Sequence, residues 1–176
     1  MEDILIISGP RTGSTYLGKE LGKNYNLKFI SEPKEIKHLK KVKCIKLIPF
    51  KSVKYSLDDI VEFSKRFSYI ILLQRKDKIA QSESWQALRA MKYLKQQDHL
   101  KWQPGTIEHK YPLEGYIDRI KYIDEKIEWL SEKLNIPISF YEDIYYGGKV
   151  PYDLNFKPDL SKRLRQEQKK KKQRYL

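Results

Sequence analysis

A glycine turn between an apolar run and a helical pattern constrains this chain more than any other feature of its sequence. Residues 4–7 are consecutive apolar side chains, typical of a buried strand. The run breaks at Gly9 and Pro10, and Ser14 then opens a segment with leucines at helical spacing. The first N–H groups of a helix lack intrahelical partners, and the helix dipole favours negative charge there. Strand, turn and helix together predict a site for a phosphate-like anion.

The side chains of this turn also suit an anion. Gly9 and Gly13 let the backbone approach a ligand closely. Ser14 and Thr15 offer hydroxyls, and Arg11 adds a planar cationic fork. The pattern departs from the nucleotide-triphosphatase loop, because its glycine spacing is one residue shorter and no lysine follows Gly13. The alternative without a ligand is a strand-to-helix turn with an incidental glycine.

The turn resembles the 5′-phosphosulfate-binding loop of sulfotransferases. That loop consists of a proline, a basic residue, a hydroxyl residue, a glycine and two further hydroxyl residues. This chain fits it at every position with Pro10, Arg11, Thr12, Gly13, Ser14 and Thr15. The resemblance implies that these residues bind the phosphosulfate of 3′-phosphoadenosine-5′-phosphosulfate (PAPS). It also implies that Arg11 stabilises charge on the departing phosphate.

A second segment resembles the 3′-phosphate-binding element of the same family. Residues 68–73 are an apolar run of strand type, and a helical pattern follows over residues 77–97. In sulfotransferases a basic residue at the strand end and a serine eight residues later bind the 3′-phosphate of the nucleotide. Lys76 and Ser84 have that spacing, with Arg75 as the alternative basic residue. A strand end followed by an ordinary charged helix start is the reading without a ligand.

A third similarity lies at residues 140–144, Phe-Tyr-Glu-Asp-Ile, because family members have a late strand ending in a similar run. The resemblance thus covers residues 3–90 and 136–144. It implies transfer of a sulfuryl group from PAPS to a hydroxyl or amine, with adenosine 3′,5′-bisphosphate (PAP) as product and no metal. The acceptor stays open between a sugar, a phenol and a peptide hydroxyl.

Such a transfer needs a general base to take the acceptor proton. Glu32 and Glu35 are the candidates, because trehalose-type enzymes favour the register of Glu35 and other carbohydrate sulfotransferases that of Glu32. The alternative is that both are surface charges beside Lys34, and His38 is a weaker rival. For the acceptor, Trp102 is a candidate lid residue, whereas Trp85 is expected to pack in the core.

Strands alternating with helices predict a single α/β domain, with a mainly parallel central sheet flanked by helices. The resemblance implies the P-loop NTPase-like sulfotransferase fold. We expect this domain over residues 1–158 and a basic C-terminal helix or tail over residues 159–176. Ligands bind at the carboxyl ends of parallel strands, so the two basic loops are expected on one rim.

Composition bounds the partners. The net charge of +13 favours anionic ligands such as a nucleotide. The Lys169–Lys172 run is typical of a solvated tail, and nucleic acid is the alternative partner for it. No apolar stretch approaches the ~20 residues that cross a bilayer, and Cys44 is the single cysteine, so we expect a cytoplasmic protein without a membrane span. The competing functions are a P-loop kinase-like phosphate-binding protein and a basic nucleic-acid-binding module.

Overall fold

The computed structural model describes residues 3–36, 39, 43–49, 55–96 and 112–158. Its centre is a five-stranded sheet in which every strand pair is parallel, in the order β2-β3-β1-β4-β5. The strands are β1 (Ile4–Ser8), β2 (Phe29–Ser31), β3 (Cys44–Leu47), β4 (Tyr69–Gln74) and β5 (Ile138–Phe140). The predicted single α/β domain with a parallel sheet flanked by helices is confirmed.

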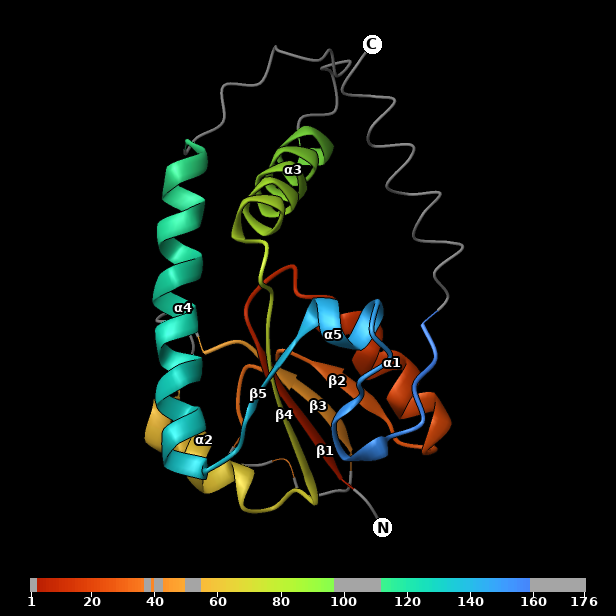
Figure 1. Cartoon of the computed structure of the whole chain (residues 1–176). Helices are drawn as coiled ribbons and strands as arrows, with labels where there is room; N and C mark the ends of the chain where they lie inside the picture. Colours follow the sequence, from red (N-terminus) through yellow and green to blue (C-terminus); the bar gives the residue numbers. More distant parts are fainter. Residues whose placement is uncertain (1–2, 37–38, 40–42, 50–54, 97–111, 159–176) are drawn as a thin grey trace.

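Helices follow the strands on both faces of the sheet. They are α1 (Ser14–Asn24), α2 (Leu57–Ser64), α3 (Lys78–Gln96), α4 (Leu113–Leu134) and α5 (Tyr141–Tyr145), with a short 3-10 turn at Pro151–Asp153. The start of α2 is fixed by a reciprocal cap, because the Ser56 hydroxyl accepts from the Asp59 N–H and the Asp59 carboxylate accepts from the Ser56 N–H. In Figure 1, α1 and α5 lie on one side of the sheet and α2 and α4 on the other.

The core consists of two apolar layers, one on each face of the sheet. Leu5 and Ile7 of β1 pack against α2, α4 and the first half of α3. Ile4 and Ile6 pack against α1, α5 and the segment that follows α5. Residues 4–7 are completely buried, as expected for a parallel strand covered on both faces.

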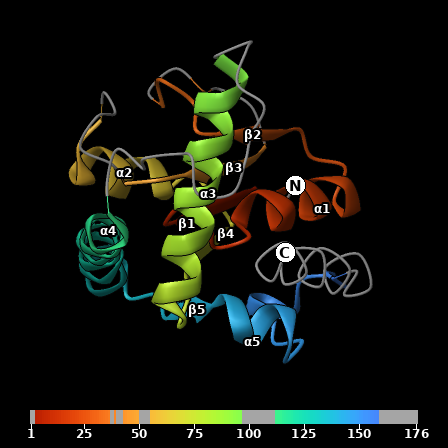
Figure 2. The same cartoon turned by 90° about the horizontal axis from the view of Figure 1, so that it is seen from above.

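The strand order reverses at β1, and this reversal locates the site. The chain places β3 and β2 on one side of β1, then β4 and β5 on the other. The loops that leave the neighbouring strands β1 and β4 therefore begin at the same carboxyl edge, beside the reversal, which is where open α/β sheets bind ligands. Seen from above, α3 crosses this edge between the two helical layers (Figure 2).

The region after α4 differs from the sequence prediction. The apolar pattern over residues 136–141 predicts a strand that includes Tyr141, but β5 ends at Phe140 and the helix α5 begins at Tyr141. Within the described ranges, none of the helices is both long and apolar enough to span a membrane. The expected basic tail, residues 159–176, lies outside the described residues.

Candidate anion-binding site

The backbone of the loop between β1 and α1 is held in an unusual conformation. Gly13 has a φ of 77°, and a Cβ added there would lie 3.0 Å from ring atoms of Tyr141 and Tyr145. The Tyr145 hydroxyl donates to the Gly13 carbonyl oxygen at 2.7 Å. Arg11 also has a positive φ, 61°, which is uncommon outside glycine. Among the described residues, no side chain caps the first N–H groups of α1.

Two of the predicted ligand hydroxyls instead hold the loop together. The Thr12 hydroxyl donates to the Gly9 carbonyl oxygen at 3.0 Å, and the Ser8 hydroxyl donates to Ser14 Oγ at 2.7 Å. Thr12 and Ser14 are buried, whereas Thr15 is exposed. Thr15 is therefore the hydroxyl of this loop that best suits a ligand.

Arg11 joins the loop to the second predicted segment. Its Nε–H donates to Ser84 Oγ in α3 at 2.9 Å. Burial and, secondarily, the positive charge of Arg75 lower the pKa of Arg11. The three residues that were expected to bind two different phosphates thus lie together at one edge of the sheet.

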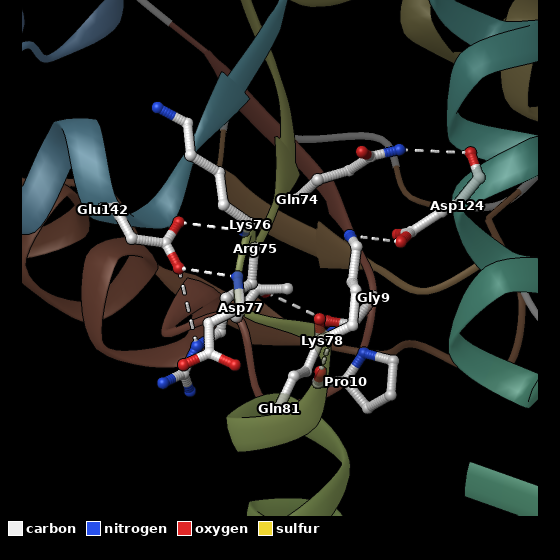
Figure 3. Close-up of polar contacts among 11 residues, drawn as sticks. Gly9, Pro10, Gln74, Arg75, Lys76, Asp77, Lys78, Gln81, Asp124 and Glu142 are labelled. Carbon is white, nitrogen blue, oxygen red and sulfur yellow. Dashed lines mark hydrogen bonds and ion pairs between the residues drawn. The ribbon is translucent and has the colours of Figure 1, made fainter. Parts of the chain in front are cut away.

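Arg75 and Lys76 follow β4 but point apart, as Figure 3 shows. The Arg75 guanidinium carbon lies 4.8 Å above the Tyr141 ring, and its Nε is 3.8 Å from Glu142 Oε1. The Lys76 ammonium instead pairs with Asp143 Oδ1 at 2.7 Å. Of the two alternatives for the basic residue, Arg75 is the one beside the loop.

Lys46 is a functional candidate that the sequence did not reveal. It lies near the end of β3 and its side chain is buried, yet its ammonium is 3.2 Å from Thr15 Oγ1 and 2.7 Å from Glu32 Oε1. A charged residue is rarely buried unless paired. A lysine within the mixed polar and apolar pattern of the strand candidate at residues 42–48 was the only signal available.

The two predicted bases lie on the segment after β2. Glu32 has a φ of 51°, and its N–H donates to the Lys46 carbonyl oxygen at 2.8 Å. Its carboxylate pairs with the Lys46 ammonium, which in turn contacts Thr15 of the loop. Glu35, three residues further on, is exposed, as Glu32 is. Burial and, to a lesser degree, the charge of Glu32 raise the pKa of nearby Tyr55 to about 12.

A largely buried set of polar contacts joins α3 to the loop after β1 and to α4 (Figure 3). Gln81 of α3 is fully buried, and its Nε2 donates to the Pro10 carbonyl oxygen at 2.7 Å. The Lys78 ammonium pairs with Asp124 of α4, and Gln74 donates to the Asp124 carbonyl oxygen at 3.2 Å. Burial raises the pKa of Asp124, and Lys78 offsets part of this effect. The network ties α3 to the loop and to α4.

Other candidates fall elsewhere. Trp85 is buried and packs edge-on against Tyr116 at a centroid distance of 5.4 Å, which agrees with the expected core role. Trp102 and His38 lie outside the described residues. Within the described ranges, no group of three or more His, Cys, Asp or Glu residues is arranged to hold a metal ion.

No protein-family model, curated protein or solved structure matches the chain. The class of this protein therefore rests on its fold and on the geometry of the site. It is a parallel α/β protein with basic side chains gathered at the strand-order reversal.

Proposed function

We propose that this protein is a sulfotransferase with a P-loop-like fold. It transfers the sulfuryl group of PAPS to a hydroxyl or amine acceptor and releases PAP. The observation that supports this best is the 2.9 Å hydrogen bond between Arg11 and Ser84. It brings the loop that suits a 5′-phosphosulfate next to the serine that suits a 3′-phosphate. One nucleotide with an anionic group on each side of its ribose can therefore contact both.

At the 5′ end, the uncapped start of α1, Arg11 and Lys46 would hold the phosphosulfate. The acceptor oxygen attacks sulfur in line, the bond between sulfur and the phosphate oxygen breaks, and its electron pair stays on the phosphate of PAP. Positive groups that face this oxygen stabilise the developing charge. Lys46 supplies the ammonium that the loop sequence lacks, since its Nζ lies 3.2 Å from Thr15 Oγ1.

We assign the general base to Glu32, with Glu35 as the alternative. The acceptor must lose one proton as it gains the sulfuryl group, and a carboxylate beside the transferred group takes it. Glu32 lies 2.7 Å from the Lys46 ammonium that contacts the loop. Binding of an anionic donor at Lys46 would loosen this ion pair and free the carboxylate for the proton.

At the 3′ end, we propose Arg75 and Ser84 as ligands of the 3′-phosphate. A guanidinium offers a bidentate fork to phosphate oxygens. Lys76 takes no part in this assignment, because its ammonium is held by Asp143.

The kinase-like alternative requires a different environment around Thr15. A magnesium-dependent phosphotransferase uses the loop hydroxyl and a nearby carboxylate to hold the metal ion. Here the group that contacts Thr15 Oγ1 is the Lys46 ammonium, whose charge repels a divalent cation. This contact favours sulfuryl transfer over magnesium-dependent phosphoryl transfer.

Thermal unfolding with candidate nucleotides tests the proposal. A ligand that binds only the native state raises Tm, and the stabilisation grows with the logarithm of its concentration relative to Kd. We expect PAP to raise Tm at micromolar to millimolar concentration, Arg11→Ala to abolish the shift, and Lys65→Ala, which removes a cation just after α2, to retain it. Labelled-sulfate transfer from PAPS to a panel of sugars, phenols and peptides then identifies the acceptor. Stabilisation by ATP with magnesium but not by PAP would overturn the proposal.

A further inference from the structure

Three consecutive residues at the start of α5 contact the turn that carries Arg75. Tyr141 lies under the Arg75 guanidinium, and Asp143 pairs with the Lys76 ammonium. Between them, Glu142 contacts the backbone of the turn. These residues belong to the Phe-Tyr-Glu-Asp-Ile run, to which the reaction proposed above gives no role.

The Glu142 carboxylate fits the turn with both oxygens. Oε2 accepts from the Lys76 N–H at 2.9 Å, and Oε1 accepts from the Asp77 N–H at 3.2 Å. Oε1 also lies 3.8 Å from Arg75 Nε (Figure 3). Asp77 in turn accepts from the Ala80 N–H at 2.9 Å and thereby fixes the first turn of α3. One carboxylate therefore orders the backbone on which Arg75 is mounted and faces its guanidinium.

We infer that Glu142 is a positioning residue that aims Arg75 at the 3′-phosphate of the nucleotide. With the Nε side of the guanidinium turned to Glu142, its terminal nitrogens remain for a phosphate. The ring of Tyr141 supports the same guanidinium from one face. This inference rests on the proposed function, because it takes Arg75 as the ligand of that phosphate.

Asp143 increases the same selectivity for the 3′-phosphate. By pairing with Lys76 at 2.7 Å, it keeps a second, flexible cation away from Arg75. One oriented guanidinium then recognises the 3′-phosphate, where two mobile cations would bind any nearby anion. The α5 segment thus sets specificity for a 3′-phosphorylated nucleotide without touching it.

The test compares the affinity for PAP with that for adenosine 5′-monophosphate, which lacks the 3′-phosphate. The ratio of the two dissociation constants is measured by calorimetry for the wild type, Glu142→Ala, Glu142→Gln, Arg75→Ala and the Arg75→Ala/Glu142→Ala double variant. Glu62→Ala is the matched control, because Glu62 is also a carboxylate in an ion pair, on the distant helix α2. Sodium formate is added to Glu142→Ala as a replacement carboxylate.

We expect Glu142→Ala to lower the preference for PAP about tenfold, with adenosine 5′-monophosphate affinity unchanged. The effect should vanish in the Arg75→Ala background, and formate should restore part of it. Glu142→Gln, which keeps one acceptor oxygen, should lie between the wild type and Glu142→Ala, and it serves if the alanine variant fails to fold. An unchanged preference in Glu142→Ala or Glu142→Gln, or an equal loss with and without Arg75, would overturn the inference alone. A wild type without preference for PAP would overturn the proposed function as well.

Discussion

The Arg11 side chain donates a hydrogen bond to Ser84 Oγ across 2.9 Å, although 73 positions separate the two residues in the chain. The contact depends on the parallel pairing of β1 with β4, which register Ser8 opposite Leu73. Because both strands end at the same edge, the loop after one and the helix after the other begin side by side. The sheet topology therefore brings together two segments that can bind the same ligand.

Two single substitutions test whether Arg75 or Lys76 binds the 3′-phosphate. Arg75→Ala should weaken PAP binding about 10- to 100-fold, the value of a charge-assisted hydrogen bond to phosphate. Lys76→Ala should change it less than about threefold, because the Lys76 ammonium is engaged by Asp143. Calorimetric titration with PAP measures both. An equal loss of PAP affinity in both variants would contradict the assignment of Arg75, rather than Lys76, as the basic ligand of the 3′-phosphate.

Glu32 and Glu35 are distinguished by turnover. Glu32→Gln should lower kcat for sulfuryl transfer by about 10²–10⁴-fold, since the amide cannot accept the acceptor proton. PAP affinity should not fall in that variant, because Lys46 loses a competing carboxylate, so an undiminished affinity together with a reduced kcat marks loss of the base. Glu35→Gln serves as the comparison and should retain near-normal turnover. The reverse result would move the base to Glu35.

The segments that sequence could predict are those with a local signal. The strand, glycine turn and helix at residues 4–24 depend on neighbours in the chain, and so does the cap of α2. The role of Lys46 depends on register instead. Lys46 is paired with Ile6 in β1 and with Ser31 in β2, and this places its ammonium between the loop and Glu32. No pattern within one segment encodes that alignment.

The supporting contacts were missed for the same reason. Gln81 contacts Pro10, which is 71 positions away in the chain, and Glu142 contacts Lys76 in the turn after β4, which is 66 positions away. Both are polar residues in helices, where a solvent-exposed face is the ordinary expectation. The choice between Arg75 and Lys76 was likewise open, because it depends on the position of α5. The sequence gives no separate signal for α5, because its first residue continues the strand pattern of residues 136–141 and Glu142 and Asp143 follow directly.

Two tyrosines with raised pKa values should respond differently to loss of their hydroxyl. Tyr55 Oη is buried with no hydrogen-bond partner within the described residues, whereas Tyr145 Oη donates to Gly13. Tyr55→Phe should leave the free energy of unfolding unchanged or raise it by about 1 kcal/mol at pH 7. Tyr145→Phe should lower it by about 1 kcal/mol. Urea unfolding of both variants measures the difference.

The pH dependence of Tyr55 has a definite sign. Its pKa is about 12 in the native state against an ordinary value of 10.0, so the native state holds the proton longer than the unfolded state. Its contribution to stability therefore falls as pH rises from about 10 to 12. The stability of Tyr55→Phe relative to the wild type should grow over this range and stay constant below it. A difference that shrinks above pH 10 would contradict the burial of the Tyr55 hydroxyl.

Gly13 and Gly148 form a matched pair for the geometry of the loop. Both have positive φ values, 77° and 65°, so alanine costs about 1–2 kcal/mol of backbone strain at either position. A Cβ at Gly13 would also lie 3.0 Å from the rings of Tyr141 and Tyr145, whereas one at Gly148 meets nothing within 4 Å. Gly13→Ala should therefore lower the free energy of unfolding by about 1–3 kcal/mol more than Gly148→Ala.

The same substitution should also reach the ligand site. Displacing Tyr141 moves the ring beneath the Arg75 guanidinium, and displacing Tyr145 weakens its hydrogen bond to the loop. Gly13→Ala should accordingly weaken PAP binding, while Gly148→Ala binds as the wild type does. Urea unfolding and calorimetry on the two variants measure both effects. Equal destabilisation with equal PAP affinity would show that the loop tolerates a side chain at Gly13, and the close packing of the tyrosines against it would then be wrong.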